Sequence, residues 1–163
     1  MIILGIDPGL AILGFGIIEK SEHNLTLIAY GTVTTPQYES TPVRLAMIDQ
    51  KITDLIAKYN PSVVAVEELF FNTNVTTGIK VAQSRGVVLV SAIKHCGHLY
   101  EYTPLQVKMA LTGNGRADKK QVQYMVKAIL NLDSIPRPDD AADAIAVAIC
   151  HANTSQFDQR EIK

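Results

Sequence analysis

The chain has 163 residues, which fits one domain with a sizeable core, and its 47% hydrophobic and 19% charged residues are the balance of an ordinary globular protein. The formal net charge of −1 does not indicate a nucleic-acid binder, so such a role would have to come from the distribution of charge. No apolar stretch is long enough to span a bilayer, and no basic region precedes the apolar N-terminal residues as in a secretory signal. We therefore expect a cytoplasmic protein that makes no membrane contact.

The first part of the chain predicts an antiparallel meander followed by a helix and a buried strand. Three segments rich in β-branched and apolar residues are separated by short polar turns. They span residues 2–7, 13–19 and 25–34. Residues 42–59 carry apolar side chains at the period of a helix. The short apolar segment 62–66 then predicts a strand that ends at Glu67 and Glu68.

The second part predicts helices with one short strand among them. The helices are expected at residues 77–96, 105–111, 119–130 and 139–152, and the strand at 99–102. Strands first and then alternating helix and strand predict an α/β fold with a mixed sheet, flanked by helices. We expect one domain over residues 1–152 and a loose polar tail over 153–163.

Carboxylates end two of the predicted strands. Asp7 follows an apolar strand and precedes Pro8 and Gly9, and Asp-Pro-Gly is a strong turn signal, so a role in the turn alone explains this stretch taken by itself. Glu67 ends the buried strand SVVAVEE in the same way, and a solvated strand end is its ordinary explanation.

Two further acids, Asp140 and Asp143, lie three residues apart at the start of the last predicted helix, so both lie on one face. Neighbouring alanines allow that face to approach a sheet closely. Helix capping by Asp139 or Asp140, and a dipole interaction for Asp143, are the ordinary explanations. The positions of these acids nevertheless allow them to converge with Asp7 and Glu67.

Four carboxylates at one point would repel one another and favour protonation, and divalent cations remove that conflict. Mg²⁺ takes carboxylate oxygens and keeps waters or phosphate oxygens as its other ligands. Two such ions activate a water and stabilise the leaving oxygen in phosphodiester hydrolysis. We interpret Cys96 and Cys150 as small core residues, and His151 as a charge partner of a helix C-terminus rather than a ligand.

Charge is distributed unevenly along the chain. Residues 79–127 hold eight basic and two acidic residues, whereas residues 1–78 hold four basic and eight acidic, and residues 128–163 hold three basic and six acidic. A basic middle third of this kind is typical of a phosphate-facing surface, although a solvated helix face has a similar composition.

Five segments in chain order resemble the RuvC family of bacterial Holliday junction resolvases. They are IDPG, AVEELFF, QSRGV, YTPLQVK with GNGRADK, and DAADAIAVAICH, and the resemblance runs from residue 2 to about residue 152. It implies a ribonuclease H-like fold, a homodimer, and Mg²⁺-dependent nicking of four-way DNA junctions in recombination and repair. It also implies two Mg²⁺ per site, Mn²⁺ as a substitute, and the branch-migration proteins RuvA and RuvB as partners.

The resemblance also assigns individual residues. The catalytic, metal-binding acids match Asp7, Glu67, Asp140 and Asp143, with Glu68 and Asp139 as one-residue alternatives. The family's functional, catalytic lysines match Lys108 and Lys119, with Lys120 as a neighbouring alternative, and its junction-contacting aromatic matches Phe70. From the basic middle third, rather than from the resemblance, we expect further DNA contacts at Lys80, Arg85, Arg116 and Lys120. Thr73 stands where many relatives have a basic residue, which predicts a weaker backbone contact there.

Several alternatives remain open from the sequence. The chain fits, less well, a nuclease of the same fold that cuts other branched DNA or RNA, one half of an actin-like ATPase, or a non-catalytic binding module. The apolar helix Val81–Ile93 contains small residues and is a candidate dimer interface, with an intrachain core helix as its alternative. Phe71, rather than Phe70, is the alternative exposed aromatic.

Overall fold

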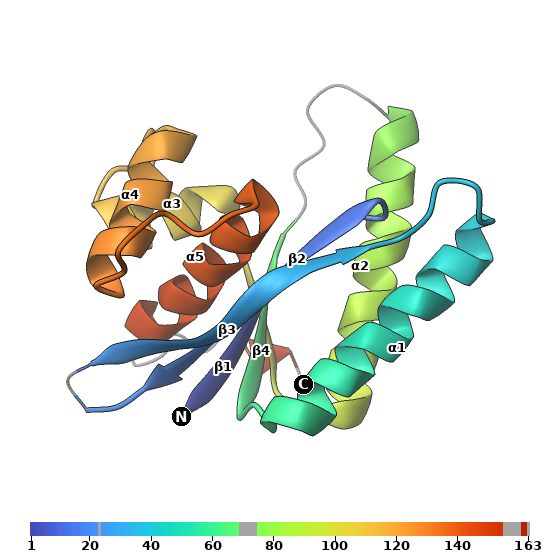
Figure 1. Cartoon of the computed structure of the whole chain (residues 1–163), viewed down its shortest axis with the longest axis horizontal. Coiled ribbons are helices and arrows are strands. Elements are labelled where there is room, and N and C mark those ends of the chain that lie inside the picture. Colours follow the sequence, from blue (N-terminus) through green and yellow to red (C-terminus); the bar gives the residue numbers. More distant parts are fainter. Residues whose placement is uncertain (23, 69–74, 155–160, 163) are drawn as a thin grey trace.

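A computed structural model describes residues 1–22, 24–68, 75–154 and 161–162 (Figure 1). In this part of the chain one mixed sheet of six strands has the order β3-β2-β1-β4-β5-β6. The strands are β1 (Ile2–Asp7), β2 (Ile12–Lys20), β3 (Leu25–Thr34), β4 (Val63–Glu67), β5 (Leu99–Tyr102) and β6 (Glu161–Ile162). The first three form the predicted antiparallel meander, and β4 and β5 continue the sheet in parallel with β1.

Among the described residues, five helices cover the two faces of the sheet, so the predicted mixed sheet flanked by helices is confirmed (Figure 1). They are α1 (Thr41–Tyr59), α2 (Val75–His95), α3 (Pro104–Thr112), α4 (Lys119–Ile129) and α5 (Asp139–Thr154). One core cluster joins the sheet to α1 and α2, and the other joins it to α3, α4 and α5. All of the strands and helices predicted up to residue 152 are present, with ends that differ by one or two residues.

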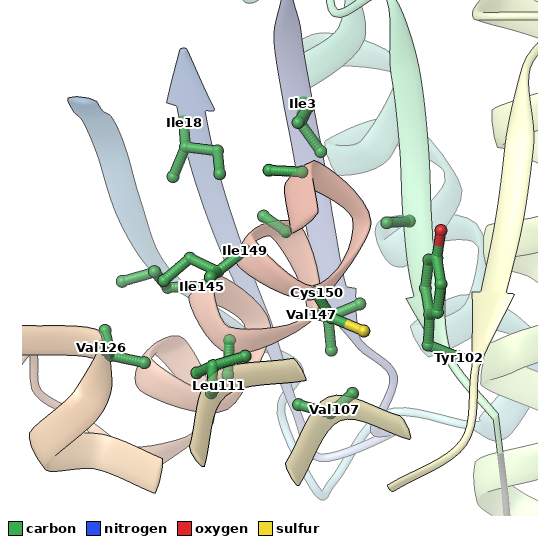
Figure 2. Packing of buried hydrophobic residues seen from close by; sticks show 14 of the residues in the cluster. Ile3, Ile18, Tyr102, Val107, Leu111, Val126, Ile145, Val147, Ile149 and Cys150 are labelled. Carbon is green, nitrogen blue, oxygen red and sulfur yellow. The ribbon is translucent and has the colours of Figure 1, made fainter. Parts of the chain in front are cut away.

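Helix α5 is the most deeply buried helix among the described residues, because it lies between the sheet and the helices α3 and α4. Figure 2 shows its side chains Ile145, Val147 and Ile149 among residues from the strands and from those helices. Its buried positions run without interruption from Ala144 to Ala152. A helix that is apolar all round must be covered on every side, which explains its central position.

Three glycines let α5 approach the sheet more closely than any side chain would allow. A Cβ atom at Gly5 of β1 would lie 2.2 Å from the carbonyl oxygen of Ala144, and one at Gly14 of β2 would lie 1.9 Å from that of Asp140. At Gly16 the nearest atom is Cγ1 of Ile145, at 2.5 Å. These glycines therefore set the distance between the first turns of α5 and the strands.

The structure corrects the interpretation of His151 as a charged helix-end partner. The residue is buried, and Tyr102 Oη lies 2.8 Å from its Nδ1. Burial and the nearby charge of Lys20 lower the pKa of His151 to about 4, so the ring is neutral at physiological pH. Cys150 is buried as predicted, while half-buried Cys96 donates to the carbonyl oxygen of Pro61 at 3.3 Å.

Several predictions concern residues that the structure does not describe. In the predicted tail, Glu161 and Ile162 pair with β5, whereas residues 155–160 and 163 lie outside the description, so the tail and the domain boundary stay predictions. Phe70, Phe71 and Thr73 lie outside it as well. Within the described ranges, no helix has the length and hydrophobicity needed to cross a bilayer.

We predict that Gly14→Ala destabilises the protein by about 1–3 kcal/mol, because the new methyl group overlaps the backbone of α5, which must shift. Equilibrium unfolding in urea measures the change. Lys51→Ala, at an exposed position of α1, is the control, and it is expected to change the stability by less than about 0.5 kcal/mol. Equal stability of wild type and Gly14→Ala would show that the close approach of α5 is not a constraint.

Candidate active site

The four predicted acids converge at one edge of the sheet. Asp7 and Glu67 are the last residues of β1 and β4, which run in parallel with Ile6 opposite Val66, so both carboxylates emerge at the same edge. Asp140 and Asp143 occupy the first turns of α5, whose backbone contacts Gly14. Because Gly14 is the ladder partner of Asp7, this contact brings the start of α5 directly to the Asp7 side chain.

The electrostatics of the cluster reveal mutual repulsion. Burial, followed by the charges of Glu67, Asp143 and Asp140, raises the pKa of Asp7 from 3.8 to about 8. Burial and the charge of Asp143 likewise raise the pKa of Glu67, which a hydrogen bond with Asp7 partly offsets. Burial also raises the pKa of Asp143. Without a cation, Asp7 therefore keeps its proton at neutral pH and shares a hydrogen bond with Glu67.

Two lysines lie beside the acids. Nζ of Lys119, the first residue of α4, lies 2.8 Å from Asp143 Oδ2 and 3.6 Å from Asp139 Oδ2. Partial burial alone would lower the pKa of Lys119, but the hydrogen bond and charge of Asp143 outweigh it and raise this pKa. Lys108 of α3 lines a pocket together with Glu67, Lys119 and Asp143. A phosphate in this pocket would face both ammonium groups.

A helix cap fixes the start of α4, the helix that carries Lys119. The Asp118 carboxylate accepts a hydrogen bond from the Gln121 N–H at 2.9 Å, and the Gln121 side chain accepts from the Asp118 N–H at 2.8 Å. A reciprocal pair of this kind satisfies two backbone donors at a helix N-terminus. Since Lys119 directly follows the cap, its backbone is held at the edge of the acidic cluster.

The donor set fits hard divalent cations. Its ligands are all carboxylate oxygens, the type that Mg²⁺ and Mn²⁺ prefer. A cation would relieve the repulsion from the neighbouring acids, which raises the pKa of Asp7 in addition to burial. In the described ranges, no three His, Cys, Asp or Glu side chains already surround one point as a ligand set. Instead, Asp7 and Glu67 share a hydrogen bond, and Asp143 forms an ion pair with Lys119.

The neighbouring acids point to other partners. Asp139 contacts Arg137 and Lys119, whereas the charge of Asp140 is one of those that raise the pKa of Asp7. The backbone N–H of Glu68 donates to the Tyr102 carbonyl oxygen at 2.8 Å, and its side chain is exposed. Neither neighbour therefore has the electrostatic coupling to Asp7 that Glu67 and Asp140 have.

The predicted DNA contacts are spread over several elements. Lys80 of α2 lines a second pocket with Asp140, and exposed Lys120 lines a third one on the outer side of α4. Arg116 is exposed in the turn before α4. Arg85 is not brought to the cluster, because its guanidinium forms an ion pair with Glu101 of β5.

Sequence reasoning missed Arg44. This residue is 8% exposed and lines the pocket that contains Lys80 and Asp140. It occupies the buried stripe of α1 that continues, at four-residue spacing, with Ile48, Ile52 and Ile56. A basic residue at a core-facing position of a helical period was the available signal, because an arginine is seldom buried without a specific role.

We predict that, without divalent metal, the contribution of Asp7 to stability falls as the pH rises from about 4 to about 8. Folded Asp7 keeps its proton up to a pKa of about 8 while the unfolded chain releases it near 3.8, so within this window unfolding releases a proton. Each unit of pKa difference is worth about 1.4 kcal/mol. Buried His151 acts in the opposite direction between its folded pKa of about 4 and its ordinary value of 6.5, so the effect of Asp7 is read from the difference between two proteins. Denaturation in EDTA at several pH values should show Asp7→Asn gaining stability relative to wild type as the pH rises through this window. Parallel profiles would contradict the raised pKa.

Known proteins resemble this chain over nearly its whole length. A family model described as Crossover junction endodeoxyribonuclease RuvC matches residues 3–151. The enzyme of that name from Alkaliphilus oremlandii is 56% identical over 157 residues, covering 96% of each chain. The structure of Thermus thermophilus RuvC matches with a TM-score of 0.89 and 36% identity over 99% of this chain and 98% of that one. T. thermophilus RuvC in complex with Holliday junction substrate matches with a TM-score of 0.90 and 33% identity, over 99% and 100% of the two chains. The predicted resemblance and the ribonuclease H-like fold are thus confirmed, and the chain belongs to the RuvC family of crossover junction endodeoxyribonucleases.

Proposed function

We propose that Asp7, Glu67, Asp140 and Asp143 form the active site at which this endodeoxyribonuclease cuts Holliday junctions during recombination and repair. The observation that carries the proposal is the convergence of four mutually repelling carboxylates at one sheet edge, with two lysines beside them. Family membership favours this function over an ATPase half or a non-catalytic module. Family membership also favours four-way DNA junctions as the substrate, rather than RNA or other branched DNA.

The acids would hold two Mg²⁺ ions, for which Mn²⁺ can substitute, and these ions would supply an activated water and stabilise the leaving oxygen. The chain's own residues have separate tasks. Asp7 and Glu67 lie at the ends of two strands and would provide rigidly held ligands, while Asp140 and Asp143 approach from α5. Lys119, paired with Asp143, is placed to donate to a phosphate oxygen and stabilise charge on it.

DNA binding rests on the basic middle third. T. thermophilus RuvC has been solved with Holliday junction substrate, and this chain shares its fold at 33% identity. We assign backbone phosphate contacts to Lys80, Lys108, Arg116, Lys119 and Lys120. Arg85 is a weaker candidate, because Glu101 already pairs with it. Base stacking by Phe70 and cooperation with RuvA and RuvB stay predictions from the resemblance.

A homodimer matches the two-fold symmetry of a junction that must be nicked on two strands. The buried Ser84, Ser91 and Ala92 of the proposed interface helix face the chain's own core, so the intrachain alternative holds for them. Another stripe of α2 is uncovered: Ile79, Val90 and Ile93 are 55%, 52% and 41% exposed. We assign this outer face of α2 to the contact with a second copy.

For the active site, we predict that Asp7→Asn lowers the rate of junction nicking in saturating Mg²⁺ by a factor on the order of 10³ or more, because a ligand and its charge are lost. Junction binding should survive, since it depends on the basic surface and the dimer. Glu68→Gln is the control and should nick normally. Gel shift and single-turnover cleavage measure the two effects. A folded Asp7→Asn protein that nicks at the wild-type rate would refute the assignment.

For the dimer, we predict that Val90→Glu yields a folded monomer, because two like charges would be buried at the two-fold contact. Ile28→Glu, at a comparably exposed apolar position on β3, is the control and should remain dimeric. Light scattering at micromolar concentration reports the mass. A wild-type monomer that still makes paired nicks, or an unchanged mass of Val90→Glu, would contradict this interface.

A further inference from the structure

A pocket of about 620 Å³ opens beside the acidic cluster, on another side from the pocket of Lys108 and Lys119. Its wall is formed by the turn of residues 9–12 that follows Asp7, and by Arg44, Lys80 and Asp140. Each pocket borders the acidic cluster, because one includes Asp140 and the other includes Glu67 and Asp143. A strand of DNA crossing the acids would therefore have a cationic pocket at each end of its path.

Arg44 is unusual for an arginine because the residue is almost completely buried and lines a pocket. Its exposed fraction is 8%, and in the described part of the chain no carboxylate forms an ion pair with it. Burial of a guanidinium without a counter-charge is costly. A structural role in the core would be filled at lower cost by an apolar residue such as the isoleucines of the same stripe. The position therefore favours an anion as the missing partner.

The side chain of Arg44 is held in place from one end. Its Nε donates to Thr35 Oγ1 at 2.8 Å, and Thr35 Oγ1 donates to the carbonyl oxygen of Leu10 at 2.5 Å. Leu10 belongs to the turn that follows Asp7, so the guanidinium is linked by two hydrogen bonds to the strand end of the active site. An anion bound by Arg44 would consequently lie at a fixed distance from Asp7.

We propose that Arg44, with Lys80, forms a phosphate-binding pocket for the cleaved DNA strand, next to the scissile phosphate. The inference rests on the proposed function and extends it to a residue to which sequence reasoning assigned no role. The planar fork of an arginine matches a phosphate with two parallel hydrogen bonds, and Lys80 adds a second charge. The acid at the rim of the pocket, Asp140, places such a phosphate beside the metal ligands.

The test combines protein variants with junctions in which one phosphate at a time, on either side of the cut, is replaced by a neutral methylphosphonate. Wild type should lose cleavage at least about tenfold when one particular neighbouring phosphate is neutralised. Arg44→Gln should cleave the unmodified junction more slowly by a similar factor and be insensitive to neutralisation of that same phosphate. Arg44→Lys should retain part of the sensitivity. The slope of log affinity against log salt should fall by about one for Arg44→Gln.

The outcomes separate the possible failures. A folded Arg44→Gln protein with the wild-type methylphosphonate profile would overturn the proposal. If Arg44→Gln does not fold, exposed Lys80→Gln takes its place, and an unchanged profile for that variant is equally contradictory. Thermal stabilisation of wild type alone by inorganic phosphate, with unchanged profiles, would assign the pocket to a free anion instead. Failure of wild type to cut an unmodified junction would refute the proposed function itself.

Discussion

The close packing of α5 against β1 and β2 is the constraint on which the active site depends. Gly5, Gly14 and Gly16 remove the side chains that would keep the helix away, and Gly14 is the ladder partner of Asp7. The same contact that completes the apolar core therefore brings Asp140 to Asp7. Packing and function are not separable here, because a shift of α5 outward would both open a cavity and disperse the carboxylates.

This arrangement holds several acids close together, which is electrostatically unfavourable in the folded protein. The raised pKa of Asp7 shows that the fold opposes its ionisation, although the proposed metal binding requires the ionised form. Lys119 partly neutralises the charge of Asp143 and lies where a phosphate would arrive. Metal and substrate would replace these internal contacts.

Much of the fold and of the site was predictable, because both follow local patterns. Strand alternation and helical periods predicted the elements, and Asp7 and Glu67 were recognisable as acids that end apolar strands. Burial by tertiary packing could not be predicted from local patterns. The sequence predicts a charged His151, whereas the structure encloses its ring beside Tyr102 and keeps it neutral. The apolar residues of α1 alone suffice to predict an amphipathic helix, so Arg44 was overlooked. The packed structure shows that this arginine is buried beside the acids.

In the proposed active site, Asp7, Glu67, Asp140 and Asp143 together bind the catalytic cations. Crystals soaked in Mn²⁺ and measured at the manganese absorption edge test this most directly, because anomalous scattering locates the ions independently of any assumption about catalysis. We expect strong peaks within coordination distance, about 2.0–2.4 Å, of these carboxylate oxygens, with Lys119 displaced from Asp143. Manganese bound elsewhere, or no ordered manganese between β1, β4 and α5 at saturating concentration, would contradict it.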